Sequence, residues 1–565
     1  MMTGIEAMIE LLAEFGVRHV FGNPGTTELP LNDRLVTDRR LQYVLGLQEV
    51  PVMAMADGYA MASGSIGVTN VHICCGLGNA MGMLYNAYRE GTPLLVTAGQ
   101  QDRRLAFEEP ILGGAMTDVA RPWTKWAVEV RRVEEIPSAI RRAVQCALTP
   151  PRGPVFLALP IDVQMESSDQ LDLTPIRLPD TRVRPPTDAV ERAVAVLREA
   201  RNPAILAGSR VTERGAMSEL VALAERLGAP VLSESGTTHG RLAFPSRHEL
   251  NGQGLPLWSP DVRERLAEYD VVLVTGMDLL RQYVYHEPSR AIPEPIRLVH
   301  LDEDPWQLGK NFPVEVGVIG DTRESLREVA DAWDRTATVD ELERARARRA
   351  RHAVRHAESR VRLEAAIGAE LRERPMTPLA CMGTIARVIP DDIAVVEEAV
   401  TTTNTTLERL GALGNTTGYF GHRGWALGWG LGCAIGVKLA WPDRPVLALL
   451  GDGAALYGAA GLWSAARYRL PVAFVICNNA QYQILKVGAR QLGLPNARDE
   501  RFESLEIRDP EVDWVALSRS FGVEAVRMEE PDRLADCLRD AWKRDTPLLI
   551  DVPLRREAPP RLNYG

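Results

Sequence analysis

An aspartate between two glycines follows an apolar run in the stretch LLGDGAALYG, and 24 residues separate this GDG tripeptide from the dipeptide NN that ends at Asn479. Asp452, Asn479 and Gln481 offer a carboxylate, an amide oxygen and a nearby backbone carbonyl. Such hard oxygen ligands suit Mg²⁺. Gly451 and Gly453 let backbone N–H groups approach a diphosphate closely. The pattern therefore predicts a site for a metal-bound diphosphate.

The two loops that carry these residues have to meet for the site to form. A predicted strand precedes each loop, and the second strand covers residues 472–477, after a helical run at about 458–468. This order brings both loops to the carboxyl edge of a parallel sheet, where open α/β folds bind ligands. A lone Gly-Asp-Gly is usually only a turn, so the flanking strands are what favours a functional site.

The same alternation of short apolar strands and amphipathic helices occurs in three blocks, residues 1–168, 187–335 and 372–555. Their predicted strands are β-branched or apolar runs at 94–98, 155–158, 204–207, 271–275 and 296–300. We expect an α/β protein with three doubly wound parallel-sheet domains. A segment rich in Asp, Pro and Arg, about residues 166–186, is predicted to be a surface linker.

A charged segment at 341–375 has many strong helix formers and is predicted to be a solvated connecting helix. His352 and His356 stand four residues apart in it, as two zinc ligands on one helical face would. Arginines surround them and no H-E-x-x-H motif is present, so a solvated face is favoured over a zinc site. The glycines of GLGNAMG do not match a dinucleotide fingerprint, because one residue too many separates the second from the third.

Composition narrows the class of protein. The chain has 565 residues, a formal net charge of −10 and an isoelectric point of about 5.6. No basic surplus exists to neutralise phosphates, which argues against a nucleic acid as the main partner. No apolar run of 18 residues predicts a membrane span. Seven cysteines without C-x-x-C spacing, and no secretory leader, predict free thiols in a reducing cytoplasm.

The spacing GDG-x24-NN resembles the diphosphate-anchoring motif of thiamine-diphosphate enzymes. The resemblance extends over nearly the whole chain and is greatest to benzoylformate decarboxylases. The segments that carry it are FGNPGTTELPL, NVHICCGLGNAMGMLYNA, LLVTAGQQDRR, ALPIDV, FPSRH, DVVLVTG, LGCAIGVKLA and GDGAALYGAAGLWSAARYRLPVAFVICNN. It implies pyrimidine-binding, middle and diphosphate-binding domains, the cofactors thiamine diphosphate and Mg²⁺, and a homotetramer with active sites at dimer interfaces.

The resemblance also implies residues that hold and activate the cofactor. Glu49 follows an apolar strand and begins a helix, and it corresponds to the glutamate that binds the pyrimidine N1′ and promotes loss of the thiazolium C2 proton. Leu427 matches the apolar side chain that bends the cofactor. Thr401 and Thr402 are expected beside the diphosphate, and Tyr482 is expected to contact the cofactor.

Substrate chemistry is expected from loops that face C2. The resemblance places a hydroxyl at Thr26, where the family usually has serine, a proton-relaying histidine at His72, and Glu28 close by. The family's second active-site histidine cannot be aligned without a gap, so Tyr283 or His286 is expected at its position.

Two further differences from the family concern the substrate pocket. Ile484 replaces a smaller residue, and His422 stands near Leu427 where the family has no histidine. Decarboxylation of a small-molecule 2-oxo acid to an aldehyde, with carboligation as a further outcome, is the expected activity. An acetolactate-synthase-like carboligase and a 2-hydroxyacyl-CoA lyase are the alternatives. The sequence leaves the identity of the 2-oxo acid open.

Overall fold

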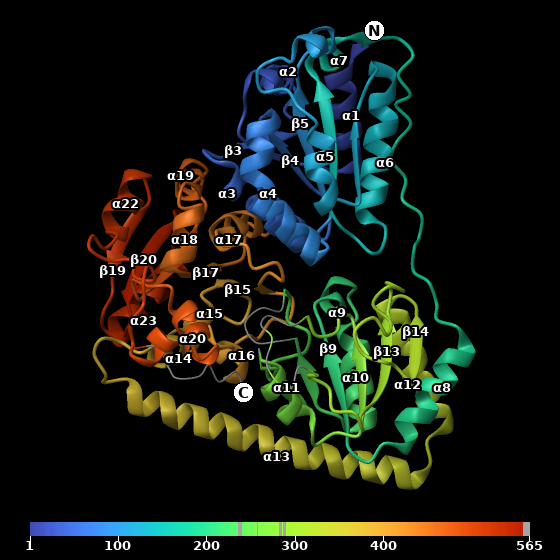
Figure 1. The fold of residues 1–565 in the computed structure, drawn as a ribbon, viewed down its shortest axis with the longest axis vertical. Helices are drawn as coiled ribbons and strands as arrows, with labels where there is room; N and C mark the ends of the chain where they lie inside the picture. Colours follow the sequence, from blue (N-terminus) through green and yellow to red (C-terminus); the bar gives the residue numbers. More distant parts are fainter. Residues whose placement is uncertain (235–239, 257, 282–284, 286, 288–289, 558–565) are drawn as a thin grey trace.

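The computed structural model describes residues 1–234, 240–256, 258–281, 285, 287 and 290–557. These residues form three α/β parts, each built on a six-stranded parallel sheet. In Figure 1 the first part lies at the top, the second at the lower right and the third at the lower left. The predicted fold class is confirmed.

The first part holds its sheet between helices on both faces. The strands, in sheet order, are β3 (Gln42–Leu45), β2 (His19–Gly22), β4 (Gly67–Val71), β5 (Leu94–Gln100), β7 (Val155–Pro160) and β6 (Trp126–Glu129). The helices are α1 (Gly4–Phe15), α2 (Leu29–Thr37), α3 (Glu49–Ser63), α4 (Ile73–Glu90), α5 (Met116–Ala120), α6 (Ile136–Leu148) and α7 (Ile161–Met165). Strands β4, β5 and β7 are buried almost throughout on both faces, which explains the continuous apolar run of β7.

The second part repeats this plan. Its strands, in sheet order, are β11 (Asn251–Gly254), β10 (Val231–Ser233), β9 (Pro203–Ala207), β12 (Val271–Thr275), β13 (Arg297–Asp302) and β14 (Val316–Ile319). Its helices are α8 (Thr187–Glu199), α9 (Arg210–Glu213), α10 (Met217–Leu227), α11 (Ser259–Leu266) and α12 (Thr322–Thr336). The runs predicted at 204–207 and 271–275 fall within β9 and β12, and the run predicted at 296–300 starts one residue before β13.

The third part carries the GDG and NN loops. Its strands, in sheet order, are β16 (Tyr419–Phe420), β15 (Ala394–Glu398), β17 (Val446–Gly451), β18 (Val472–Asn478), β20 (Leu548–Pro553) and β19 (Glu524–Arg527). Its main helices are α14 (Pro378–Ala386), α15 (Val400–Thr403), α16 (Thr406–Arg409), α17 (Trp429–Ala440), α18 (Asp452–Gly458), α19 (Gly461–Arg467), α20 (Gln483–Gln491), α21 (Pro495–Arg498), α22 (Trp514–Ser520) and α23 (Pro531–Ala541). The helical run predicted at about 458–468 is confirmed by α19, and the structure adds a further helix, α18, that starts at Asp452 itself.

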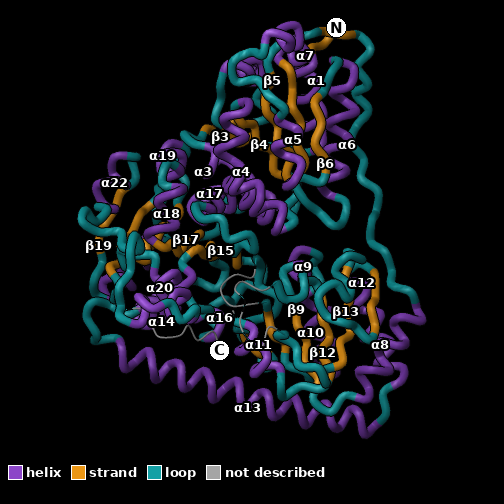
Figure 2. The backbone as a smooth tube through the Cα atoms, viewed as in Figure 1, coloured by secondary structure: helices purple, strands orange, loops and turns teal. Residues whose placement is uncertain are grey.

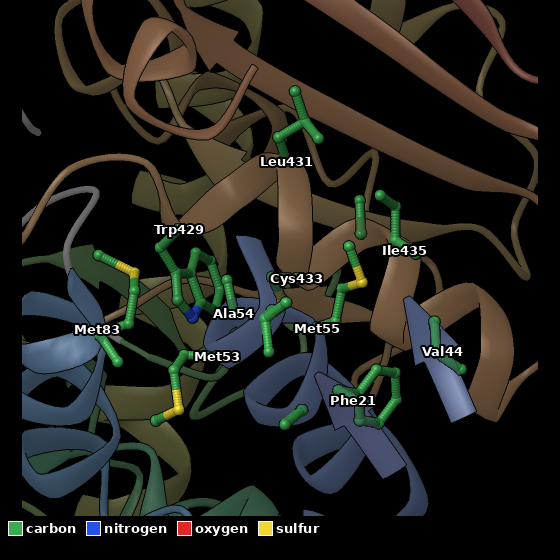
Figure 3. Close-up of a cluster of buried hydrophobic side chains, with 14 of the residues drawn as sticks. Phe21, Val44, Met53, Ala54, Met55, Met83, Trp429, Leu431, Cys433 and Ile435 are labelled. Carbon is green, nitrogen blue, oxygen red and sulfur yellow. The ribbon is translucent and has the colours of Figure 1, made fainter. Parts of the chain in front are cut away.

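Helices α3 and α17 join the first part to the third. Their labelled side chains, among them Met55, Trp429 and Cys433, lie together in Figure 3. The backbones approach so closely that a Cβ added at Gly436 would lie 1.9 Å from the carbonyl oxygen of Met55. The indole Nε1 of Trp429 also donates to Asp57 of α3 at 2.7 Å. This interface therefore has little freedom to slide.

Two connections link the parts. Residues 169–186 run without helix or strand along the outside of the molecule, as predicted for a linker (Figure 2). Helix α13 (Val339–Glu370) then spans from the second part to the third (Figure 1). It is not solvated on every side as predicted, because its face toward the second part buries His352 and Arg348, whose guanidinium donates to the carbonyl of Leu227. Among the helices of the described residues, none is long and apolar enough to cross a bilayer.

One buried histidine predicts how the fold responds to acid. His300 in β13 is 0 % exposed, and burial lowers its pKa from 6.5 to about 4. The unfolded chain takes up this proton near pH 6.5 but the folded chain only near pH 4, so stability is complete above pH 6.5 and falls as the pH drops through this window. We expect His300→Met to flatten the dependence of unfolding free energy on pH by up to about 1.4 kcal/mol per pH unit. Urea unfolding between pH 7.5 and 4.5 measures it, and an unchanged slope would contradict the assignment.

Candidate active site

The GDG loop ends strand β17 and starts helix α18. Strand β17 pairs in parallel with β18, and the register sets Gly451 opposite Cys477, so Asp452 and Asn479 both follow at the carboxyl edge of the sheet. Burial raises the pKa of the Asp452 carboxyl to about 7, although backbone N–H groups of both loops, including those of Gly453 and Ala480, hydrogen-bond to it. Asp452 is 4 % exposed. A buried carboxylate of this kind gains from a cation beside it.

The residues after Asn478 form a tight turn. The amide oxygen of Asn479 accepts from the backbone N–H of Gln481 at 3.2 Å, and its nitrogen donates to Gln483 at 3.1 Å. The side chain of Gln481 is engaged by Lys486, which donates to it at 2.6 Å, so its backbone carbonyl is the atom suited to a metal. Tyr482 places its ring against Gly453. Both loops thus face one region of the sheet edge.

Glu49 is the first residue of α3, at the carboxyl end of the first sheet. The side chain of Gln48 caps this helix by accepting the N–H of Val50. Glu49 is 5 % exposed, and Asn79 of α4 donates to its Oε2 at 3.1 Å. A Cβ added at Gly76 would lie 3.1 Å from Oε1, so this glycine leaves room for the carboxylate. The carboxylate is therefore held in one orientation beside the start of α4.

A second carboxylate holds His72. The Nδ1 atom of His72 lies 2.7 Å from Oε2 of Glu28, and Glu28 is 1 % exposed. Glu28 also accepts the backbone N–H groups of Gly25, at 3.1 Å, and Gly99, at 2.8 Å. A carboxylate on Nδ1 favours the tautomer with the proton there, and leaves Nε2 for a substrate. Thr26 is exposed at the start of the same short 3₁₀ helix, η1 (Thr26–Glu28).

Leu427 lies in a turn that leads into α17. Its side chain is 38 % exposed, and the next residue, Gly428, has φ of +99°, a conformation that favours glycine. The carboxylate of Glu398, at the end of β15, accepts the N–H groups of Gly428, Trp429 and Gly430 at 2.9–3.0 Å. These hydrogen bonds therefore fix the backbone where the turn joins helix α17.

The loop after β15 carries the two threonines expected beside the diphosphate. Thr401 and Thr402 lie in α15, where Thr402 is 3 % exposed and donates its N–H to Ala399 at 2.8 Å. Strand β15 is the neighbour of β17, so this loop and the GDG loop share one sheet edge.

His422 is buried near the Leu427 turn. Burial lowers its pKa to about 4, so the ring is neutral at neutral pH. Its Nδ1 accepts the N–H of Trp425 at 3.1 Å, and the ring lies 5.0 Å from that of Trp429. Its Nε2 lies 3.6 Å from Oε1 of Glu398, the carboxyl group at the end of β15.

The predicted site residues thus form two groups. Glu49, His72, Glu28 and Thr26 lie on the first sheet's carboxyl edge, whereas Asp452, Asn479, Thr402 and Leu427 lie on that of the third. Helix α3 packs on α17 and also touches α18. Tyr283 and His286 lie outside the described residues. Asn79, Asn86 and Glu398 were missed, because a single amide or carboxyl residue gives no spacing signal.

Three models of one protein family match this chain. The model of the thiamine pyrophosphate enzyme N-terminal TPP-binding domain matches residues 2–114, that of the central domain matches 190–329, and that of the C-terminal TPP-binding domain matches 402–552. Together they cover more than half of the chain.

Three individual proteins extend the comparison. Benzoylformate decarboxylase of Pseudomonas aeruginosa is 32 % identical, and the match covers 99 % of this chain and 100 % of the relative. A probable acetolactate synthase large subunit of Methanocaldococcus jannaschii is 27 % identical over 98 % of this chain and 92 % of its own. The crystal structure of benzoylformate decarboxylase from Polynucleobacter necessarius is 28 % identical, with a TM-score of 0.86 over 99 % of this chain and 100 % of that one.

Proposed function

Because this chain belongs to the thiamine pyrophosphate enzyme family, we propose that it decarboxylates a 2-oxo acid to an aldehyde with thiamine diphosphate (thiamine pyrophosphate) and Mg²⁺. The cofactor, when bound, supplies the nucleophile for the keto carbon and takes up the electron pair left when CO₂ departs. The observation that supports this reaction most is the pairing of a buried Glu49 with an oriented His72–Glu28 pair on the same sheet edge.

The chain's own residues supply binding and proton transfer. Glu49 would bind the pyrimidine, and Asn79 keeps its carboxylate in place. His72, fixed through Nδ1 by Glu28, presents Nε2 for the proton that the product gains, and Thr26 offers a hydroxyl. Asp452, the Asn479 amide and the Gln481 backbone carbonyl would hold Mg²⁺, while Thr401, Thr402 and the backbone of Gly451 and Gly453 would hold the diphosphate.

The acetolactate synthase relatives favour a second candidate, in which the site would take a second carbonyl compound as acceptor and release a carboligation product. The discriminating experiment is a screen of 2-oxo acids with and without acceptor aldehydes, in which CO₂ and products are followed by mass spectrometry. Release of an aldehyde with CO₂ supports the decarboxylase. If no 2-oxo acid releases CO₂ but an acyloin or a 2-hydroxyacyl-CoA is cleaved, the lyase alternative replaces it.

Ile484 is proposed to limit substrate size. It is half-buried in the first turn of α20, two residues after Tyr482. We expect Ile484→Ala to shift kcat/KM toward bulkier 2-oxo acids by about 1–3 kcal/mol at most, because close-packed pockets respond to single methylene groups. Leu485→Ala, at a side chain that is 44 % exposed, is the matched control. Equal shifts in the two variants would remove Ile484 from the pocket.

We further propose a homotetramer with active sites at dimer interfaces. Tyr457 in α18 leaves apolar surface exposed, and so do Phe107 and Ile111 after β5, which suits a covering subunit. Inactive Glu49→Gln and Asp452→Ala chains, mixed under subunit exchange, are then expected to regain part of the activity. Because α3 also meets α17 and α18 within one chain, a mixture that stays inactive would place both residues of each site in the same subunit.

A further inference from the structure

A buried asparagine of the first part grips the turn that carries Leu427. Asn86 in α4 is 0 % exposed, its Nδ2 donates to the carbonyl of Ala426 at 2.8 Å, and its Oδ1 accepts the N–H of Ala426 at 3.0 Å. One side chain thereby pairs with both backbone groups of the residue directly before Leu427. A side-chain amide that copies a backbone pairing in this way fixes the local peptide planes.

The same face of α4 makes further contacts with the site. One side of α4 carries four residues that follow one another at intervals of three or four positions: Asn79, Gly82, Asn86 and Glu90. Asn79 binds Glu49, Gly82 faces the Cβ of Ala426, and Glu90 accepts from the backbone N–H and Nε of Arg423 at 3.0 and 3.2 Å. The helix therefore connects the proposed activating carboxylate with the Leu427 turn.

The other end of the turn is held from the third part. Glu398 is buried and accepts three consecutive N–H groups, beginning with that of Gly428, directly after Leu427. These groups are the free donors at the start of α17, and the carboxyl oxygens of Glu398 satisfy them. Leu427 thus stands between two backbone clamps, one from each α/β part.

We propose that Asn86 and Glu398 are positioning residues that set the height of Leu427 under the cofactor and so determine how far the cofactor is bent. The inference rests on the proposed function, in which Leu427 supports the cofactor. Neither side chain touches the reacting atoms; both act through Leu427. Loss of either clamp lets the turn relax, and misplacement of a support by about 1 Å can cost roughly 100-fold in rate.

A double-mutant cycle tests the inference. The rate at which bound thiamine diphosphate exchanges its C2 proton for deuterium is measured by acid quench and NMR in Asn86→Ala, Leu427→Ala and the double variant, with Mg²⁺ present. We expect Asn86→Ala to slow exchange roughly 10- to 100-fold when Leu427 is present, and to have little effect once Leu427 is already Ala, because positions that act as a unit are not additive. Glu398→Gln replaces one accepting oxygen by a donor. It should likewise slow exchange when Leu427 is present and have little effect once Leu427 is Ala.

Asn251→Ala is the matched control, since Asn251 is also buried but lies in the second part, away from the turn. It should leave exchange unchanged. If Asn86→Ala fails to fold, Asn86→Asp takes its place, because it keeps the acceptor for the Ala426 N–H and sets an oxygen in place of the donor to the Ala426 carbonyl. Additive effects of the clamp and Leu427 variants in an active enzyme overturn this inference alone, whereas wild-type protein without cofactor-dependent exchange overturns the proposed function as well.

Discussion

Glu49→Gln is expected to slow loss of the C2 proton from bound thiamine diphosphate by about 10²- to 10⁴-fold, the range typical of a lost acid–base group. Glutamine keeps the size of the side chain and its bond with Asn79, so cofactor binding should survive. Calorimetric titration with the cofactor and Mg²⁺, together with C2 exchange by NMR, separates the two effects.

Glu6→Gln is the control for this prediction. Glu6 is also a first-turn acid of a helix in the first part, where it caps α1 with Thr3. If Glu49 only stabilised the helix through its dipole, Glu49→Gln would lower the stability by about 0.3–1 kcal/mol and leave the C2 exchange rate unchanged, as expected for Glu6→Gln. Exchange at the wild-type rate in Glu49→Gln would show that the assignment is wrong.

Asp452→Ala is expected to weaken Mg²⁺-dependent binding of thiamine diphosphate by more than about 100-fold. Mutation of a residue that only hydrogen-bonds to a metal ligand already lowers metal affinity about 10- to 100-fold. A ligand that binds only the folded state stabilises it by about 2.7 kcal/mol at a hundred times its Kd. The wild-type melting temperature should therefore rise with cofactor and Mg²⁺, but not with NAD, and that of Asp452→Ala should not.

Asp443→Ala provides the comparison, because Asp443 is exposed in the loop before β17. Its response to the cofactor should equal that of the wild type. A full cofactor-induced rise in the Asp452→Ala variant would place the metal elsewhere, and no rise in the wild-type protein would contradict the proposed cofactor.

The sequence determined the fold class and one edge of the site. Parallel strands buried on both faces leave long apolar runs, and such runs before Gly451 and Asn478 predicted the meeting of two loops that the pairing of β17 with β18 confirms. The family resemblance supplied the roles of Glu49, His72 and Leu427, and these stay predictions until the variants are measured.

Only the tertiary structure revealed what surrounds these residues. Asn86 and Ala426 are 340 positions apart, and their pairing depends on which face of α4 meets the turn. The neutral state of His422 and the burial of His352 likewise follow from neighbours contributed by other elements. Local patterns record strand and helix periods and turn chemistry, because neighbours along the chain cause them; contacts between distant segments arise only when whole faces pack, and the sequence carries no spacing that marks them.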